Sequence, residues 1–331
     1  MKGLLTAILA GTFSLAAMSQ GSTSKSVLSQ ANTALQAGEA DKALSLLAPL
    51  TSNQAQGLDT HDRALAHNLT CRVHYMLERW NRAAEECDLA VRYDSGNGIY
   101  HMWLGRTLGE RASHVSFLSA YSLSKRVRAE FEEAARLEPR NPEVLADLGE
   151  FYYQAPGVVG GGQDKALRVA SQMDSLDRMR ALELRAKIAE QHKDLGTAEN
   201  LLKQAISGSP HSAFQWLGLA AFYRRHQRWQ EMESALNSCY LSVEHDHHAT
   251  NALFGAGGML LSTRRNLPLA TKMLEIYLAG PNKNEDSPAF VAHLELARIK
   301  EQSGDMAEAQ KQRAIAQSMA HDYHSAEERR H

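Results

Sequence analysis

The feature that most constrains the fold of this chain is an internal repeat of 34 residues. Two adjacent segments show it clearly, because small and large apolar residues recur in them in the same order. Leu182 lies 34 positions before Trp216, and Ala186 lies 34 positions before Ala220. Good helix formers dominate both segments, and the alternation of β-branched residues that strands require is missing. A period of this length is typical of helical hairpins that stack on one another.

Related segments recur along nearly the whole sequence. In each, small residues such as Gly105 and Gly149 stand where two helices cross, and large residues such as Phe131 fill the gaps between them. A single hairpin cannot bury its apolar face, so neighbours must stack. We therefore expect an all-α, right-handed superhelical solenoid over residues 25–320. Its eight expected hairpins lie near 24–57, 64–97, 98–141, 142–178, 179–212, 213–246, 251–284 and 290–323.

Residues 1–19 have the layout of a secretory signal peptide. Lys2 supplies a positive charge, an uncharged stretch of about fifteen residues follows, and small residues precede an expected cleavage site before Gln20. A helix that spans a bilayer needs roughly twenty apolar residues, so an uncleaved anchor is the less favoured alternative. We expect an exported protein, periplasmic or secreted, without stable membrane insertion. A short disordered linker at 20–24 and a polar tail at 324–331 would flank the solenoid.

The segment from Trp216 to Tyr223 fits the Trp-x2-Leu-Gly-x2-Tyr signature of the tetratricopeptide repeat, with alanine in place of glycine. The chain resembles the tetratricopeptide repeat (TPR) superfamily over about residues 25–320. Its middle section, from Trp103 to Tyr153, is also similar to the repeat domain of the regulator-of-microtubule-dynamics proteins. A microtubule role does not suit an exported chain, so this second resemblance implies only the fold. The TPR resemblance implies a scaffold that binds a protein or peptide partner.

Partners of TPR proteins usually lie in the groove lined by the first helix of each hairpin. Residues three positions before and one or four positions after the small residue should face that groove. Their mixture of aromatic side chains and both charge signs suits an extended peptide, and the net charge of −2 does not suggest a nucleic-acid binder. A merely solvated helix face is the alternative. The expected groove residues are Asn68, Arg72, Tyr75, Met102, Arg106, Glu150, Tyr153, Lys187, Glu190, Ala221 and Arg224.

Cys71 and Cys87 fall at level positions on the two helices of one hairpin. Small residues there bring the helices together, so the two Cα atoms can come within disulfide range. Export also makes a disulfide chemically possible. We predict this bond, with two buried thiols as the alternative. Cys239 replaces the small residue of another second helix and is expected to be a buried free thiol.

Two segments interrupt the period. About ten extra residues lie within 110–122, where they either lengthen the helices or form a loop that Phe117 and Tyr121 anchor. About five more lie within 155–162, directly before a helix. Glycine N–H groups at a helix start can face an anion, although a tight turn that needs positive φ is the plainer interpretation. The glycines concerned are Gly160, Gly161 and Gly162.

Catalytic motifs are missing from the sequence. It contains no Gly-x-Ser-x-Gly, His-Glu-x-x-His or Cys-x-x-Cys, so we predict no enzyme and no cofactor. The segment from His245 to His248 is rich in histidine, but consecutive histidines rarely all reach one ion, and we predict no metal site. Two alternatives remain: a minor metal- or anion-dependent activity at the glycines or the histidines, and a structural solenoid that self-associates through its end hairpins.

Overall fold

The computed structural model describes residues 11–52, 58–209, 212–243, 249–281 and 283–324, with side chains from residue 24 onward. Over these ranges the chain forms sixteen α-helices and one short 3-10 helix, with an isolated bridge between Asn284 and Ser287 and no strand. The expected all-α solenoid is therefore confirmed. Within the same ranges, none of the helices is both long enough and apolar enough to cross a membrane.

Consecutive helices pair into eight antiparallel hairpins. Helix α1 includes residues 20–24, which the sequence suggests as a linker, and it runs across the expected cleavage position before Gln20. The paired helices are α1 (Gly11–Gln36) and α2 (Ala40–Thr51), α3 (Thr60–Met76) and α4 (Trp80–Tyr93), α5 (Gly98–Ser113) and α6 (Phe117–Leu137), α7 (Pro142–Gln154) and α8 (Gln163–Met173), α9 (Arg178–Gln191) and α10 (Leu195–Gly208), α11 (Ala213–Arg225) and α12 (Trp229–Val243), α13 (Asn251–Ser262) and α14 (Leu267–Ala279), and α15 (Ala289–Gln302) and α16 (Met306–Met319).

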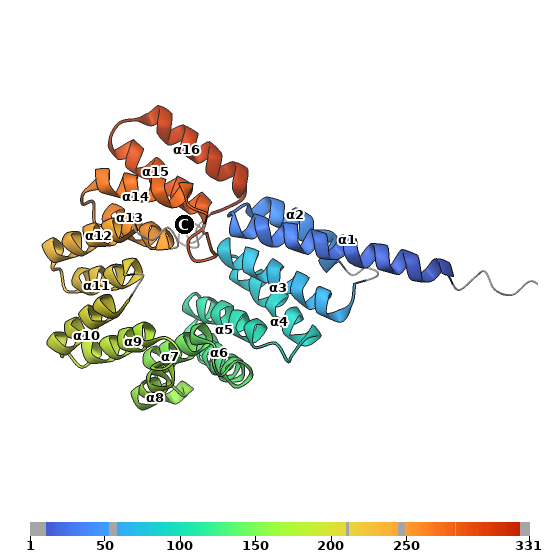
Figure 1. Cartoon of the computed structure of the whole chain (residues 1–331), viewed down its shortest axis with the longest axis horizontal. Helices are drawn as coiled ribbons and strands as arrows, with labels where there is room; N and C mark the ends of the chain where they lie inside the picture. Colours follow the sequence, from blue (N-terminus) through green and yellow to red (C-terminus); the bar gives the residue numbers. More distant parts are fainter. Residues whose placement is uncertain (1–10, 53–57, 210–211, 244–248, 282, 325–331) are drawn as a thin grey trace, which may run out of the picture.

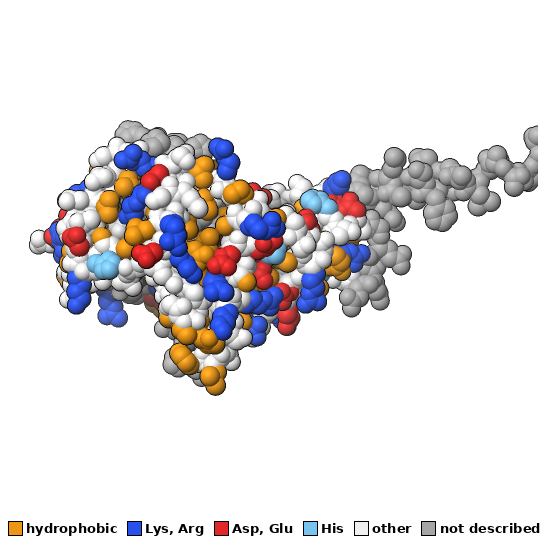
Figure 2. All heavy atoms as spheres, turned by 90° about the horizontal axis from the view of Figure 1, so that it is seen from below, with side chains coloured by type: hydrophobic (Ala, Val, Ile, Leu, Met, Phe, Trp, Pro, Cys, Tyr) orange, Lys and Arg blue, Asp and Glu red, His pale blue; other side chains and the backbone are white. Residues whose placement is uncertain are grey.

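The hairpins form two concentric layers (Figure 1). The first helix of each hairpin lies toward the centre, and α3, α5, α7 and α9 contact one another in sequence along this inner layer. The second helices form the outer layer. Seen from below, the surface carries side chains of both charge signs between hydrophobic ones (Figure 2).

Side chains and backbone geometry define the ends of these helices. Asp59, Asn141 and Asp194 each accept a hydrogen bond from a backbone N–H in the first turn of the following helix, which satisfies a donor that the helix leaves unpaired. The turns inside hairpins need a residue in the left-handed region. Gly38 has φ 77° and Gly304 has φ 82° at such turns. These local signals explain why the chain reverses at regular intervals.

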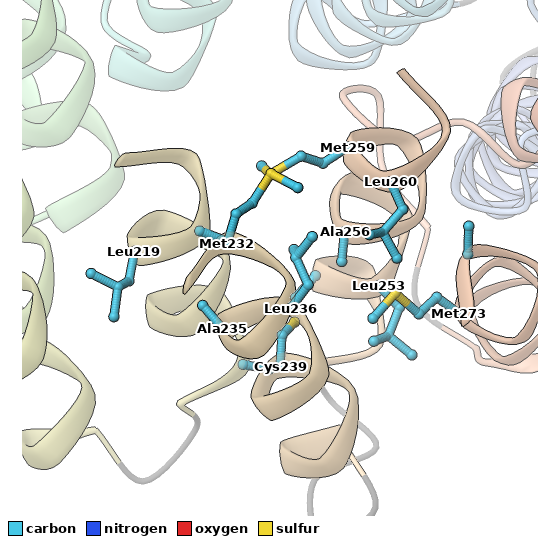
Figure 3. Packing of buried hydrophobic residues seen from close by; sticks show 14 of the residues in the cluster. Leu219, Met232, Ala235, Leu236, Cys239, Leu253, Ala256, Met259, Leu260 and Met273 are labelled. Carbon is cyan, nitrogen blue, oxygen red and sulfur yellow. The ribbon is translucent and has the colours of Figure 1, made fainter. Parts of the chain in front are cut away.

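The core lies between the helices of each hairpin and between adjacent hairpins. Figure 3 shows Met232, Leu236 and Cys239 of α12 facing Leu253 of α13. Where two helices approach most closely, only glycine fits. A Cβ at Gly149 would lie 2.6 Å from the side chain of Leu184. The small residues of the repeat are therefore required by the close approach of backbone to side chain.

The extra residues at 110–122 form the end of α5 and the beginning of α6, so they lengthen the helices of the third hairpin and form no long loop. Helix α6 has 21 residues and begins at Phe117. The side chains of Phe117 and Leu118 are 83% and 81% exposed, so Phe117 anchors nothing. Tyr121 lies under Lys125, whose Nζ is 4.4 Å from the ring centroid.

The ends of the solenoid meet and close it into a ring, which the sequence analysis does not anticipate. In Figure 1, α15 and α16 lie beside α2. Arg72 of α3 donates from Nε to Oε1 of Glu285, in the loop before α15, at 2.5 Å. The hydroxyl of Tyr323 donates to Glu78 at 2.8 Å. Phe290 of α15 is fully buried in one cluster with the apolar residues of α1 and α2. The first helices of the hairpins thus follow one another around the centre of the ring.

Candidate partner-binding site

A pocket of about 760 Å³ opens between α9 and α11, on the inner layer of the ring. We call it the inner pocket. Part of its wall is apolar, and Phe214 there is 44% exposed, which is unusual for a residue of its size. The apolar residues that line it are Met179, Ala186, Leu202, Phe214, Leu217, Ala221 and Ala249. Exposed apolar surface inside a concavity is typical of a binding site.

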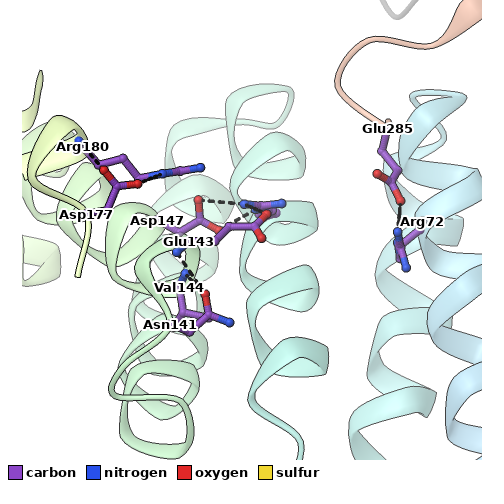
Figure 4. A network of polar contacts seen from close by, with 9 residues as sticks. Arg72, Asn141, Glu143, Val144, Asp147, Asp177, Arg180 and Glu285 are labelled. Carbon is purple, nitrogen blue, oxygen red and sulfur yellow. Dashed lines mark hydrogen bonds and ion pairs between the residues drawn. The ribbon is translucent and has the colours of Figure 1, made fainter. Parts of the chain in front are cut away.

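The cations of the inner pocket are already paired with carboxylates. Arg225 donates from Nε and Nη2 to the two oxygens of Glu190, both at 2.7 Å. Burial raises the pKa of Glu190, but the hydrogen bonds from Arg225 outweigh it and hold that pKa below its ordinary value. Lys187 pairs with Glu150 of α7 at 2.8 Å, and Arg180 pairs with Asp177, as Figure 4 shows.

Glu183 is the carboxylate of the inner pocket that has no ion-pair partner among the described residues. Burial raises its pKa above the ordinary value. Its Oε1 accepts a hydrogen bond from Nε2 of Gln215 at 3.2 Å. The other end of that amide, Oε1 of Gln215, is buried without a donor. An unsatisfied buried carbonyl costs about 1–3 kcal/mol. The amide of Gln215 therefore contacts Glu183 with one end and leaves its carbonyl able to accept a donor.

A second polar group lies further along the inner layer, on α3, α5 and α7. The guanidinium groups of Arg72 and Arg106 both lie over the ring of Trp103, at 5.2 and 4.9 Å from its centroid. Arg106 donates from Nε to Asp147 at 2.5 Å and from Nη2 to Glu143 at 2.9 Å (Figure 4). These contacts fix both arginines, because each guanidinium group pairs with a carboxylate and also lies over the ring of Trp103.

The structure brings together some of the expected groove residues. Glu150, Lys187 and Glu190 form ion pairs across α7, α9 and α11, and Tyr153 lies close enough for Glu150 and Glu190 to act on its pKa. Tyr75 packs against Trp103, with ring centroids 5.4 Å apart.

Other expected groove residues lie elsewhere. Asn68 and Met102 are each only 2% exposed, so they belong to the core and not to the groove. Arg224 points into solvent, whereas the neighbouring Arg225 lines the inner pocket. The reason is the helical register, because α11 presents the positions of Gly218, Ala221 and Arg225.

Sequence reasoning missed Glu183, although a signal for it existed. Glu183 lies three positions before Ala186, the register that was applied to Asn68 and Met102. At this register the structure buries Met102 but exposes Leu217 to the inner pocket. Register alone therefore does not separate a pocket residue from a core residue, because the side chains of the neighbouring hairpins decide whether a position is covered.

The two cysteines of the second hairpin are bonded to each other. The Cα atoms of Cys71 and Cys87 are 5.2 Å apart, in the usual range for a disulfide. Cys239 is a free, buried thiol, and burial raises its pKa to about 12. It is therefore a small core residue without thiolate reactivity.

The three glycines before α8 serve the backbone of their own loop. Gly160 adopts φ 96°, and a Cβ at Gly161 would lie 1.8 Å from the carbonyl oxygen of Ala155. The N–H groups of all three already donate within the chain. Gly160, Gly161 and Gly162 donate to the carbonyl oxygens of Gly157, Pro156 and Tyr152 at 2.9, 3.2 and 2.8 Å. These amides are not available to an anion.

The histidine-rich segment from His245 to His248 lies outside the described residues. Where the structure does describe the chain, no group of three or more His, Cys, Asp or Glu side chains has the arrangement of a metal site.

Comparisons with known proteins find likeness among solved structures alone. No family model matches the sequence, and no curated protein matches it. A tetratricopeptide repeat protein from Parabacteroides merdae is similar in structure, with a TM-score of 0.47, 13% identity, and coverage of 84% of this chain and 99% of that one. The apo form of the quorum sensor NprR from B. thuringiensis has a TM-score of 0.45, 10% identity, and coverage of 89% and 87%.

A chain of the APC/C hetero-tetramer Cut9-Hcn1 is also similar, with a TM-score of 0.39 and 11% identity. This chain aligns over 89% of its own length but over only 53% of that one, about half. These likenesses concern the fold alone. The period of 34 residues and the eight stacked hairpins define the fold of this chain as an all-α solenoid of helical hairpins.

Proposed function

We propose that this protein is an exported scaffold that holds an extended segment of a partner protein on the inner face of its ring, in cell-envelope assembly, secretion or surface regulation. The observation that carries the proposal is the inner pocket, where exposed Phe214 and Leu217 lie beside the unpaired carboxylate of Glu183. Binding sites for peptides combine apolar contact with a few fixed polar groups in this way.

An extended peptide would supply the apolar side chains and the hydrogen-bond donors that the exposed groups of this pocket can bind. Its apolar side chains would cover Phe214, and a backbone N–H or an ammonium group would donate to the carboxylate that Gln215 contacts. The paired cations around the pocket favour a partner without a large net charge, since they already have carboxylate partners. A polyanion would have to displace those pairs.

The signal-like layout of residues 1–19 supports export. N-terminal sequencing of the protein from its native source tests this part alone. We expect a mature chain that begins at Gln20, and a chain that begins at Met1 would contradict export without affecting the binding proposal.

Gly218 gives a sharp test of the binding site. It lines the inner pocket, and a Cβ there would meet no atom within 4 Å. Gly218→Trp should therefore fill the pocket without disturbing the backbone. Gly109 of α5 is equally open and does not line the inner pocket, so Gly109→Trp is a matched control.

The assay is affinity capture from the native envelope fraction, with mass spectrometry of what each variant retains. We expect the wild-type protein and Gly109→Trp to retain the same partner and Gly218→Trp to lose it, while circular dichroism stays helical for all three. If Gly218→Trp retains every partner, the inner pocket is not the binding site. Arginine reversals such as Arg106→Glu are less suitable, because Arg106 is ion-paired to Asp147.

The structure does not favour the self-associating solenoid. The end hairpins that a second copy would need for stacking are packed against each other within one chain. The anion-dependent alternative at the glycines also loses its basis, since the three N–H groups there are used.

A further inference from the structure

We propose a second binding site, on the outer part of the molecule between α6, α7 and α8, which takes an acidic segment of a partner protein that also carries apolar side chains. We call it the outer groove. It has a volume of about 800 Å³ and shares no lining residue with the inner pocket. The proposal is independent of the function proposed above, and either one can fail alone.

The outer groove is strongly basic. Four cationic side chains line it, Arg136, Arg140, Lys165 and Arg168, against the single carboxylate of Glu132. The whole chain, by contrast, has a net charge of −2. Figure 2 views the side of the molecule on which α6 and α8 lie in Figure 1 and shows Lys and Arg side chains next to hydrophobic ones, with Asp and Glu side chains among them. A concave surface lined by one sign of charge raises the local concentration of the opposite sign.

Two of these cations have no carboxylate to neutralise them. Arg140 and Arg168 are exposed, and no Asp or Glu of the described residues lies within ion-pair distance of either. The one acidic residue of the outer groove is already engaged. Glu132 accepts a hydrogen bond from the hydroxyl of Tyr152 at 2.8 Å and lies 3.7 Å from the guanidinium of Arg128.

The other two cations are held in place by local contacts. Arg136 donates from Nε and Nη2 to Glu133 at 2.8 and 2.7 Å. Lys165 donates to the carbonyl oxygen of Gly160 at 2.7 Å, and its Nζ lies 5.1 Å from the ring centroid of Tyr152. The glycine loop before α8 thus fixes one wall of the outer groove, which gives that insertion a role in shaping the site.

The floor of the outer groove is apolar, which decides the kind of partner. Leu145, Leu148 and Val169 lie beneath it but are only 2–6% exposed, so its accessible apolar surface comes from the exposed Pro139 and the partly buried Ala135 and Leu176. Free phosphate would pair with the arginines but would leave the apolar floor exposed to water. A single-stranded nucleic acid would need aromatic faces for its bases, and Tyr152, the aromatic residue of the lining, already has Lys165 over its ring. Carboxylates at the rim and apolar side chains on the floor fit best.

Peptide selection with a counter-selection step tests the proposal. Random dodecapeptides displayed on phage are first depleted on the Arg140→Gln/Arg168→Gln double variant and then selected on the wild-type protein. Arg82→Gln/Arg92→Gln is the matched control for depletion, because both residues are exposed on α4 and the loss of charge is the same. Circular dichroism verifies that each variant is folded, and exposed substitutions of this kind usually change stability little.

We expect depletion on the outer-groove variant to enrich peptides that combine several acidic residues with Leu, Ile or Phe. Depletion on the control variant should not enrich them. Synthetic peptides from the enriched pool should bind the wild-type protein roughly 5–30-fold more tightly than the Arg140→Gln/Arg168→Gln variant, as two exposed ion pairs allow, and binding should weaken as salt is raised.

Three results would overturn the proposal. The first is an enriched pool without acidic residues, or no enrichment at all. The second is equal affinity for the enriched peptides and for versions in which Asn and Gln replace Asp and Glu. The third is full displacement of the peptides by an oligonucleotide or by inorganic phosphate at equal charge concentration, which would assign the outer groove to phosphate groups.

Discussion

Removal of Arg72 should open the ring, whereas removal of its partner should not. The pair of Arg72 and Glu285 joins α3 to the loop before α15. The Glu285 side chain is 6% exposed and that of Arg72 is 21% exposed. Arg72→Met would leave a buried carboxylate without a cation, at a cost of about 3–5 kcal/mol. Glu285→Gln would leave an arginine with access to water, at a cost of about 1 kcal/mol.

The other contacts that join the two ends of the ring contribute free energies of similar magnitude. Burial of Phe290 contributes about 1.5–3 kcal/mol, and the hydrogen bond from Tyr323 to Glu78 contributes roughly another 1.5–3 kcal/mol. The cost of Arg72→Met is comparable to these two contacts together, while Ala316, Ala320 and the hydrogen bond from the N–H of His321 to Asp41 also hold the closure. We expect a fraction of this variant to open, since an open ring hydrates Glu285.

Small-angle scattering and urea unfolding measure the two effects. Arg72→Met should increase the radius of gyration and lower the free energy of unfolding, and Glu285→Gln should leave the radius unchanged. The double variant Arg72→Met/Glu285→Met should recover the closed form, because an apolar pair replaces the ion pair without leaving a charge. Equal effects of the two single substitutions, or an unchanged radius for Arg72→Met, would refute the reasoning.

Three further outcomes are expected. Replacement of Cys71 and Cys87 by alanine should lower the free energy of unfolding by about 3 kcal/mol, since the bond closes a loop with a sequence separation of 16; denaturant unfolding measures this, and an effect below 1 kcal/mol would contradict it. Burial raises the pKa of Glu295 to about 7 from 4.5. The protonated carboxyl therefore contributes fully to the free energy of unfolding below pH 4.5, and this contribution is lost as pH rises through 7. Glu295→Gln should remove up to about 3 kcal/mol of this change in the free energy of unfolding with pH. Melting temperatures of the variant that fall with rising pH as steeply as those of the wild-type protein would contradict this. Gly149→Ala should cost about 1–3 kcal/mol because its Cβ meets Leu184, while Gly218→Ala, in open space, should stabilise by about 0.5–1 kcal/mol; thermal melting that ranks them in the opposite order would refute the packing argument.

The sequence alone determined the kind of fold. A period of 34 residues with small residues such as Ala186 and Ala220 at fixed positions leaves one solution, in which paired helices pack closely and the pairs stack. These signals are local, since each lies within one or two hairpins. The level positions of Cys71 and Cys87 are of the same kind, because a single hairpin fixes their separation.

Only the tertiary structure decided how the ends meet and which inner residues stay accessible. Contacts such as Arg72 with Glu285 join residues more than two hundred positions apart, and no periodic signal encodes them. Met102 is buried and Glu183 lines a pocket at the same register, because exposure depends on which side chains of neighbouring hairpins cover a position and not on the repeat itself.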